Sequence, residues 1–211
     1  MTHSLGEIDS LARRAARGAG MSWGLAEEAG QAVAWLSAHG LPGADDLAAL
    51  LQRQDNRDHS AAHPMTDRSS WKARDGALCP IAAGAALSDR ADDIAQMQSL
   101  RLLNCDMPFL LLPFLASIAQ RTGVAVRITV AAHDAVCSPK GLYLSQDVPD
   151  ADSPASDVTL VPQAPLQGMH IPRGRRATPN EHALTVLTQF ADRLYAPETE
   201  ARRRTGAGED S

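Results

Sequence analysis

The chain has 211 residues, of which 44% are hydrophobic and 21% charged, and a chain of this length buries enough surface to fold without a disulfide, a metal or another cofactor. Its formal net charge is −5, so there is no positive field that would hold nucleic acid. Its most apolar stretch, 107–116, is about half of the roughly 20 residues that a membrane-spanning helix needs, which argues against a membrane partner.

Two amphipathic helices are predicted near the N-terminus. Ser4 and Glu7 form a capping box, and apolar residues at helical spacing follow over 5–17. Ser22 is a good N-cap for a second helix, whose apolar stripe ends at Gly40. The first part of the chain is therefore expected to be a compact helical unit.

A short third helix is expected over 45–51, after which the helical pattern disappears. Residues 52–77 are rich in polar and charged side chains and have little apolar periodicity, which predicts an exposed loop. The small-residue patch 81–87 permits close backbone approach but does not by itself indicate helix or strand.

The middle of the chain contains strand patterns and one buried helix. A helix is expected over 108–121, with its start near Leu112 because Pro113 fits the first turn better than the middle of a helix. Alternating or punctuated apolar runs predict strands over 99–104, 124–130, 142–145 and 158–161.

The last predicted helix begins at a second capping box, Thr178 to Glu181, with Pro179 at the first helical position, and ends before Pro197. Residues 198–211 have no apolar anchor and are expected to form a mobile polar tail. These elements predict a mixed α/β protein with one globular domain over 1–197. In it the N-terminal helical unit and the C-terminal helix pack on a mixed sheet of about four strands.

The candidate ligand-binding surface follows the first helix. Glycine turns and a helix N-terminus beside arginines favour an anion, because backbone N–H groups and guanidinium groups both bind carboxylates or phosphates. The alternative is that the arginines form a solvated helix face and the acidic residues support the helix N-terminus. The residues of this surface are Arg17, Ser22, Trp23, Glu27 and Glu28.

A second group of residues is a weaker candidate for catalysis. The loop expected over 133–141 combines an imidazole, a carboxylate and a thiol after a strand, and a thiol and a carboxylate follow the strand at 99–104. A cysteine nucleophile needs a histidine within hydrogen-bond reach, whereas the alternative is a polar turn with buried structural thiols. These candidates are Cys105, Asp106, His133, Asp134 and Cys137.

The cysteines also indicate a compartment. Cys79, Cys105 and Cys137 are widely spaced without a CxxC pair, which is typical of free thiols and does not resemble a zinc site. The N-terminus lacks the basic and apolar segments of a secretory signal. We therefore expect a cytoplasmic protein without a metal.

The segment ARGAGMSWGLAEEAG at 16–30 resembles a family of uncharacterised bacterial proteins known only as a domain of unknown function. The resemblance is expected to cover most of the chain, and it implies no activity, cofactor or catalytic residue. The other segments that carry it are 40–43, 78–81, 83–89, 195–197 and 204–208.

Three functions are compatible with these features. The first is a small-molecule-binding or accessory subunit in bacterial metabolism, with an anionic small molecule as its ligand. The second is a small-molecule enzyme that uses a Cys/His/Asp site. The third is a structural partner in a homo- or hetero-oligomer.

Overall fold

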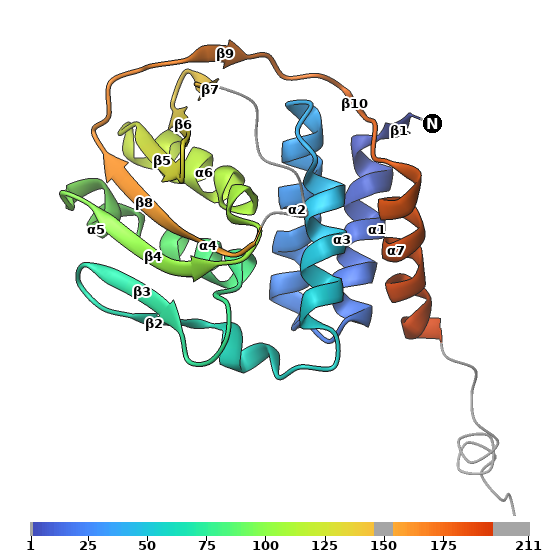
Figure 1. Cartoon of the computed structure of the whole chain (residues 1–211). Helices are drawn as coiled ribbons and strands as arrows, with labels where there is room; N and C mark the ends of the chain where they lie inside the picture. Colours follow the sequence, from blue (N-terminus) through green and yellow to red (C-terminus); the bar gives the residue numbers. More distant parts are fainter. Residues whose placement is uncertain (1, 146–153, 196–211) are drawn as a thin grey trace, which may run out of the picture.

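The computed structural model describes residues 2–145 and 154–195. Figure 1 shows a group of long helices beside a sheet that carries shorter helices on one face. The long helices are α1 Leu5–Gly18, α2 Trp23–Ala38, α3 Gly43–Gln54 and α7 Glu181–Asp192. The N-terminal helices therefore follow the predicted order, and the C-terminal helix joins them. The mixed α/β class is confirmed.

The caps expected at the first two helices are present. The Ser4 N–H donates to Glu7 Oε2 at 2.7 Å, and the Glu7 N–H donates to Ser4 Oγ at 3.2 Å. Ser22 Oγ accepts from the Leu25 N–H at 3.4 Å at the start of α2. Each contact satisfies a backbone donor that the helix itself leaves free, so these boundaries are fixed locally.

The cap of α7 differs from the prediction. Asn180 is the N-cap, and its Oδ1 accepts from the Ala183 N–H at 2.6 Å. The capping box expected from Thr178, with Pro179 inside the helix, is wrong. Asparagine is as good a cap as threonine, and Asn180 also donates to Asp45 at the start of α3. Helix α7 therefore begins next to a residue whose side chain also contacts α3.

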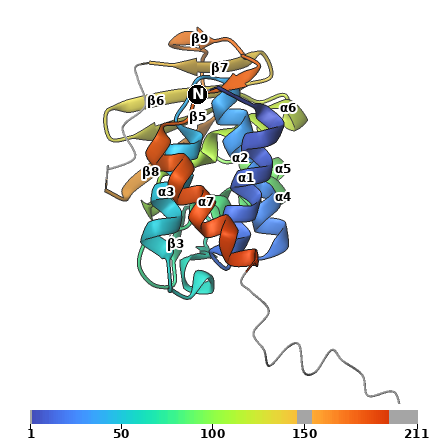
Figure 2. The same ribbon diagram turned by 90° about the vertical axis from the view of Figure 1, so that its right-hand side faces the viewer.

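Close backbone approach holds the helical layer together, and Figure 2 shows α1, α3 and α7 at the front of this layer. A Cβ atom added to Gly18 of α1 would lie 1.8 Å from the carbonyl oxygen of Phe190 in α7. A Cβ atom added to Gly30 of α2 would lie 2.4 Å from Asp9 Oδ1 in α1. Any larger residue at these positions would push the helices apart.

The main sheet has eight strands in the order β2-β3-β4-β8-β5-β6-β7-β9, so it is larger than the sheet of about four strands that was expected. The pairing of β3 with β4 is parallel, and the other neighbouring strands are antiparallel. The strands are β2 Pro64–Thr66, β3 Ser70–Ala73, β4 Leu100–Cys105, β5 Val126–Val130, β6 His133–Ser138, β7 Gly141–Leu144, β8 Ser156–Pro162 and β9 Met169–Ile171. A separate pair joins β1 His3–Ser4 to β10 Arg176–Ala177.

The segment 52–77 is not the continuous exposed loop that its composition predicts. It contains the end of α3, a short 3₁₀ helix η1 (His59–Ala62), and the strands β2 and β3. Trp71 in β3 is fully buried, and its indole N–H donates to the Asp67 carbonyl at 3.0 Å. The strand is too short to show a period, and its pairing with β4 joins residues about thirty positions apart.

The loop expected over 133–141 is also corrected. Most of it is the strand β6, which pairs with β5 on one side and β7 on the other. Ala131, with φ of 51°, lies in the tight turn between β5 and β6. The small-residue patch forms α4 Pro80–Asp89, which is followed by α5 Ala91–Gln96.

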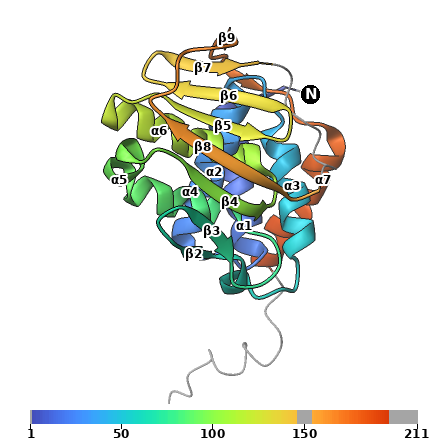
Figure 3. The same cartoon turned by 60° about the vertical axis from the view of Figure 1, so that its left-hand side comes forward.

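The shorter helices cover one face of the sheet, as Figure 3 shows with α4, α5 and α6 behind the strands. A 3₁₀ turn, η2 (Pro108–Leu111), precedes α6 Leu112–Thr122, and Pro113 lies in the first turn of α6 as expected. The helix α2 packs against α1 and α3 on one side and against α4 and α6 on the other. It therefore connects the helical layer to the sheet.

Within the described residues, no helix combines the length and apolar character that crossing a membrane requires. The polar tail predicted over 198–211 lies outside the described residues.

Candidate functional site

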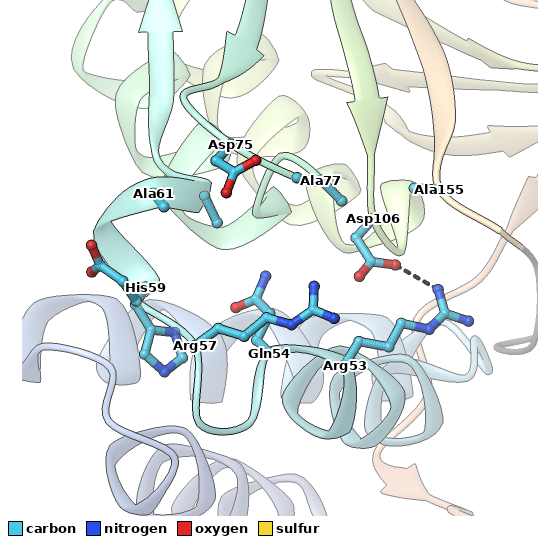
Figure 4. A pocket seen from close by; sticks show the side chains of 12 residues that line it. Arg53, Gln54, Arg57, His59, Ala61, Asp75, Ala77, Asp106 and Ala155 are labelled. Atoms are coloured by element: carbon cyan, nitrogen blue, oxygen red, sulfur yellow. Dashed lines mark hydrogen bonds and ion pairs between the residues drawn. The ribbon is translucent and has the colours of Figure 1, made fainter.

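A cavity of about 580 Å³ opens where the helical layer meets the sheet. Its walls are the C-terminal end of α3, the 3₁₀ helix η1, the turn after β3 and the end of β4 (Figure 4). We call it the α3–η1 cavity. The residues that line it are Arg53, Gln54, Arg57, Asp58, His59, Ala61, Ala62, Asp75, Gly76, Ala77, Asp106 and Ala155.

One wall of the cavity carries a paired charge. Arg53 Nη1 lies 2.6 Å from Asp106 Oδ1, and the same oxygen accepts from the Met107 N–H at 3.1 Å. The Asp106 residue is 3% exposed, whereas a third of the Arg53 side chain is exposed. The ion pair therefore fixes Arg53 at the wall and neutralises the buried carboxylate.

The backbone around Asp106 is unusual. Asn104 has φ of 51° and Met107 has φ of 38°, and neither is glycine. Such left-handed residues cost free energy and are concentrated at functional sites. The Asn104 side chain donates to the Gly76 carbonyl at 3.0 Å, which ties the end of β4 to the turn after β3. This geometry holds Asp106 in a fixed place at the cavity.

Gln54 is, after Asp106, the most enclosed polar residue of the cavity. It is 7% exposed, and its Oε1 is buried without a hydrogen-bond partner. Its side chain also lies near the Cys79 thiol. A buried amide oxygen that lacks a partner costs about 1–3 kcal/mol, so this atom is a candidate acceptor for a ligand.

Two charged side chains of the cavity have no side-chain partner among the described residues. Arg57 and Asp75 are both exposed, and neither makes a side-chain hydrogen bond or ion pair there. In Figure 4 the Arg57 guanidinium reaches across the cavity beside Gln54, and Asp75 lies on the opposite wall. By contrast, Asp58 is occupied, because it accepts from the N–H and the hydroxyl of Ser60 at 2.9 and 2.8 Å.

The sequence-predicted ligand residues lie elsewhere. Arg17 Nη1 donates to the Met21 carbonyl at 2.6 Å, and its guanidinium lies 5.0 Å from the centre of the Trp23 ring, which is 65% exposed. Ser22 caps α2. The structure thus brings Arg17, Ser22 and Trp23 together at the turn between α1 and α2. His59 links this turn to the α3–η1 cavity, through a 2.7 Å hydrogen bond between its Nε2 and the Ala19 carbonyl.

The two predicted glutamates, Glu27 and Glu28, lie apart from the contacts at the turn between α1 and α2. Glu27 is exposed, and Glu28 lines another cavity of about 400 Å³ between α2, the end of α4 and α6. Burial, followed by the nearby carboxylates of Asp89 and Glu27, raises the pKa of Glu28. The five predicted residues therefore do not face one common pocket.

The candidate catalytic residues are divided between two distant strands. Cys105 and Asp106 lie at the end of β4, whereas His133, Asp134 and Cys137 lie on β6, with β8 and β5 between them. The structure therefore does not bring Cys105 and His133 together.

Cys105, Cys137 and Asp134 make contacts within the fold. Cys105 and Cys137 are fully buried, and burial raises the pKa of both thiols. Cys137 Sγ donates to the Leu112 carbonyl at 3.4 Å, and Asp134 accepts from the Thr129 hydroxyl at 2.5 Å. Only Asp106 lines the α3–η1 cavity. In the part of the chain that the structure describes, no three His, Cys, Asp or Glu residues are placed to hold a metal ion.

Sequence reasoning missed Arg53, Gln54, Arg57 and Asp75. They lie in or beside the segment taken as a loop, and no motif spacing marks them. The cavity combines residues from position 53 to position 155, and only the fold brings these together.

The comparisons with known proteins agree with an uncharacterised family. Residues 3–75 match the family described as "Protein of unknown function (DUF3726)", which confirms the kind of family that the sequence resembles. The match ends at Asp75, so it includes Arg53, Gln54 and Arg57 but not the segments 78–89 and 195–208 that also suggested the resemblance. No curated protein matches the sequence.

Among solved structures, the chain is similar to a dehydrogenase from Sinorhizobium meliloti, with a TM-score of 0.58 and 11% identity over 90% of this chain and 99% of that chain. It is also similar to malate dehydrogenases from Pyrococcus horikoshii OT3 (TM-score 0.49, 11% identity) and Entamoeba histolytica (TM-score 0.48, 8% identity). These two matches cover 72% and 74% of this chain but only 52% and 47% of the malate dehydrogenases. The first likeness indicates a shared fold.

Proposed function

We propose that the protein binds the carboxylate group of a small organic molecule in the α3–η1 cavity and acts as a binding or accessory subunit in metabolism. The observation that carries this proposal is the Arg57 guanidinium, which reaches into the cavity without a protein partner among the described residues. A guanidinium group can donate two parallel hydrogen bonds to a carboxylate, which is its preferred planar partner.

The size of the cavity supports the same function. A volume of about 580 Å³ lies within the range of roughly 300–1,000 Å³ that is usual for small-molecule pockets. Arg53 is already neutralised by Asp106, so it shapes the wall, whereas Arg57 is available for the ligand. The fold shared with a dehydrogenase is consistent with small-molecule chemistry, since that protein is named as an enzyme.

The test is a titration of the full chain with simple carboxylates such as succinate and glutarate, and with inorganic phosphate. We expect a carboxylate to bind, and Arg57→Gln to weaken its binding about 10- to 100-fold, because a hydrogen bond to a charged group contributes about 1.5–3 kcal/mol. Arg68→Gln is the matched control, because Arg68 is also exposed but does not line the cavity. Unchanged affinity in Arg57→Gln would overturn the proposal.

An enzyme that acts on the ligand in the same cavity is the second candidate. The observation in its favour is Asp106, a buried carboxylate between two left-handed residues at the cavity wall. Asp106→Asn should then retain ligand binding and abolish turnover of the bound carboxylate. A variant that retains turnover would exclude this role for Asp106.

A further inference from the structure

We infer that the ligand of the α3–η1 cavity is a zwitterion, an amino acid whose ammonium group lies beside its carboxylate. The inference rests on the proposed function, which assigns the carboxylate to Arg57. It adds a second recognition element, formed by Gln54 Oε1 and the Asp75 carboxylate, which both require a hydrogen-bond donor.

Gln54 is the first observation behind this element. The residue is more than nine-tenths buried, and its Oε1 has no partner, so the folded protein has already lost the water that would satisfy this atom. A second carboxylate or a phosphate on the ligand would bring another acceptor toward this oxygen. A ligand with an N–H donor would instead remove the cost of about 1–3 kcal/mol that the unpaired oxygen carries.

Asp75 is the second, independent observation. Its carboxylate lines the same cavity and has no side-chain partner among the described residues. A carboxylate repels a purely anionic ligand, whereas it attracts an ammonium group. An ammonium group has three N–H donors, which is enough for both Asp75 and Gln54 Oε1. A hydroxyl group has one donor and could satisfy only one of them.

The charge balance of the cavity leads to the same class. Arg53 and Asp106 neutralise each other at 2.6 Å. Asp58 keeps its negative charge, but both of its carboxylate oxygens already accept hydrogen bonds from Ser60. One guanidinium, Arg57, and one carboxylate, Asp75, remain for a ligand. A ligand that pairs with both of these side chains carries one negative and one positive group of its own.

The experiment compares three sets of probes at equal concentration on the full chain. They are a mixture of the twenty L-amino acids, the same amino acids N-acetylated, and the corresponding carboxylates without the amino group. Saturation-transfer NMR detects which compounds bind, and calorimetry then gives the affinity of each binding amino acid and of its two analogues. We expect the amino acid to bind at least about 10-fold more tightly than either analogue.

Two variants test the assigned residues. Gln54→Leu and Asp75→Asn should each reduce the preference for the amino acid over its deaminated analogue, while Arg57→Gln weakens both compounds. Gln52→Leu, on the exposed face of the same helix, and Asp92→Asn, far along the chain, are the matched controls. As a readout without ligand, Gln54→Leu should melt at a higher temperature than the natural protein, because it removes the unpaired buried oxygen.

The outcomes separate the two proposals. Equal binding of the amino acid and its deaminated analogue, with both weakened by Arg57→Gln, would overturn the zwitterion and leave the anion site in place. Full preference for the amino acid in both Gln54→Leu and Asp75→Asn would overturn the assigned recognition element. If no probe of any set binds, the proposed function itself fails, and the inference fails with it.

Discussion

The turn between α1 and α2 and the α3–η1 cavity are both rich in polar groups, but these groups differ in the protein partners that they have. At the turn, Arg17 donates to the backbone and stacks near Trp23, and Ser22 caps the next helix. In the cavity, Arg57 and Gln54 Oε1 are without protein partners among the described residues. The two regions therefore differ in whether a guanidinium finds a protein acceptor: Arg17 does, whereas Arg57 reaches into the cavity without one among the described residues.

The helix α3 forms one wall of the cavity, and Asp46 in its first turn offers the largest expected effect. Burial, followed by the Asp45 charge, raises the pKa of Asp46 to about 8. Between about pH 4 and pH 8 the unfolded chain therefore loses this proton and the folded chain keeps it, so the contribution of Asp46 to stability is largest at low pH and falls as pH rises. From about pH 5 to pH 8 the free energy of unfolding should fall by up to about 4 kcal/mol.

Urea unfolding at these two pH values measures the change. Asp46→Asn should remove most of the decrease and should be more stable than the natural protein at about pH 8. Asp92→Asn, an exposed carboxylate in the first turn of α5, is the control and should leave the decrease unchanged. A natural protein whose stability is the same at both pH values would contradict the assignment.

A substitution at Gly18 should disrupt the packing of α1 against α7 in the helical layer. In Gly18→Ala the new Cβ atom would lie 1.8 Å from the Phe190 carbonyl oxygen, and a backbone atom cannot rotate away. We expect a loss of about 3 kcal/mol in the free energy of unfolding, at the upper end of overpacking costs. Gly6→Ala in the same helix has nothing within 4 Å and should be neutral or slightly stabilising. Equal melting temperatures for the two variants would refute the close contact.

The cap at Ser22 sharpens the distinction between a structural turn and a ligand site. Ser22→Ala removes an acceptor for the Leu25 N–H and should cost about 1 kcal/mol of stability. Carboxylate affinity, measured by the same titration as for Arg57→Gln, should not change. A large loss of affinity in Ser22→Ala would restore the Arg17–Trp23 surface as the ligand site.

The three thiols give the smallest expected effect in the folded protein, where they should be close to unreactive. Burial raises the pKa of Cys79, Cys105 and Cys137, and the higher pKa lowers the fraction of each that is thiolate. Burial also limits the access of reagents to the sulfur atoms. Iodoacetamide labelling, followed by mass spectrometry, should be roughly 100-fold slower in buffer than in concentrated urea. One cysteine that reacts rapidly in buffer would favour a nucleophilic role over a structural one.

The elements that sequence reasoning predicted well are those whose signals are local. The Ser4–Glu7 capping box, the stripe of α2 and the alternation of β5 each depend on residues within one helix or strand. The position of Pro113 in the first turn of α6 followed from its own ring and missing N–H.

The elements that were missed depend on distant partners. The strand β3 is recognisable only by its pairing with β4, and β6 only by its place between β5 and β7. The cap of α7 moved to Asn180, where the side chain also reaches Asp45 in α3. Local capping rules could not choose between two good caps.

By itself the sequence determined the fold class, the N-terminal helices with their caps, and the absence of a strong positive charge, because these depend on composition and on neighbours a few residues apart. Only the tertiary structure decided which polar groups remain without partners. Gln54 Oε1 and Arg57 became candidates for recognition once β4, η1 and the end of α3 enclosed them. The physical reason is that a hydrogen-bonding group is unsatisfied only in relation to everything that surrounds it in space.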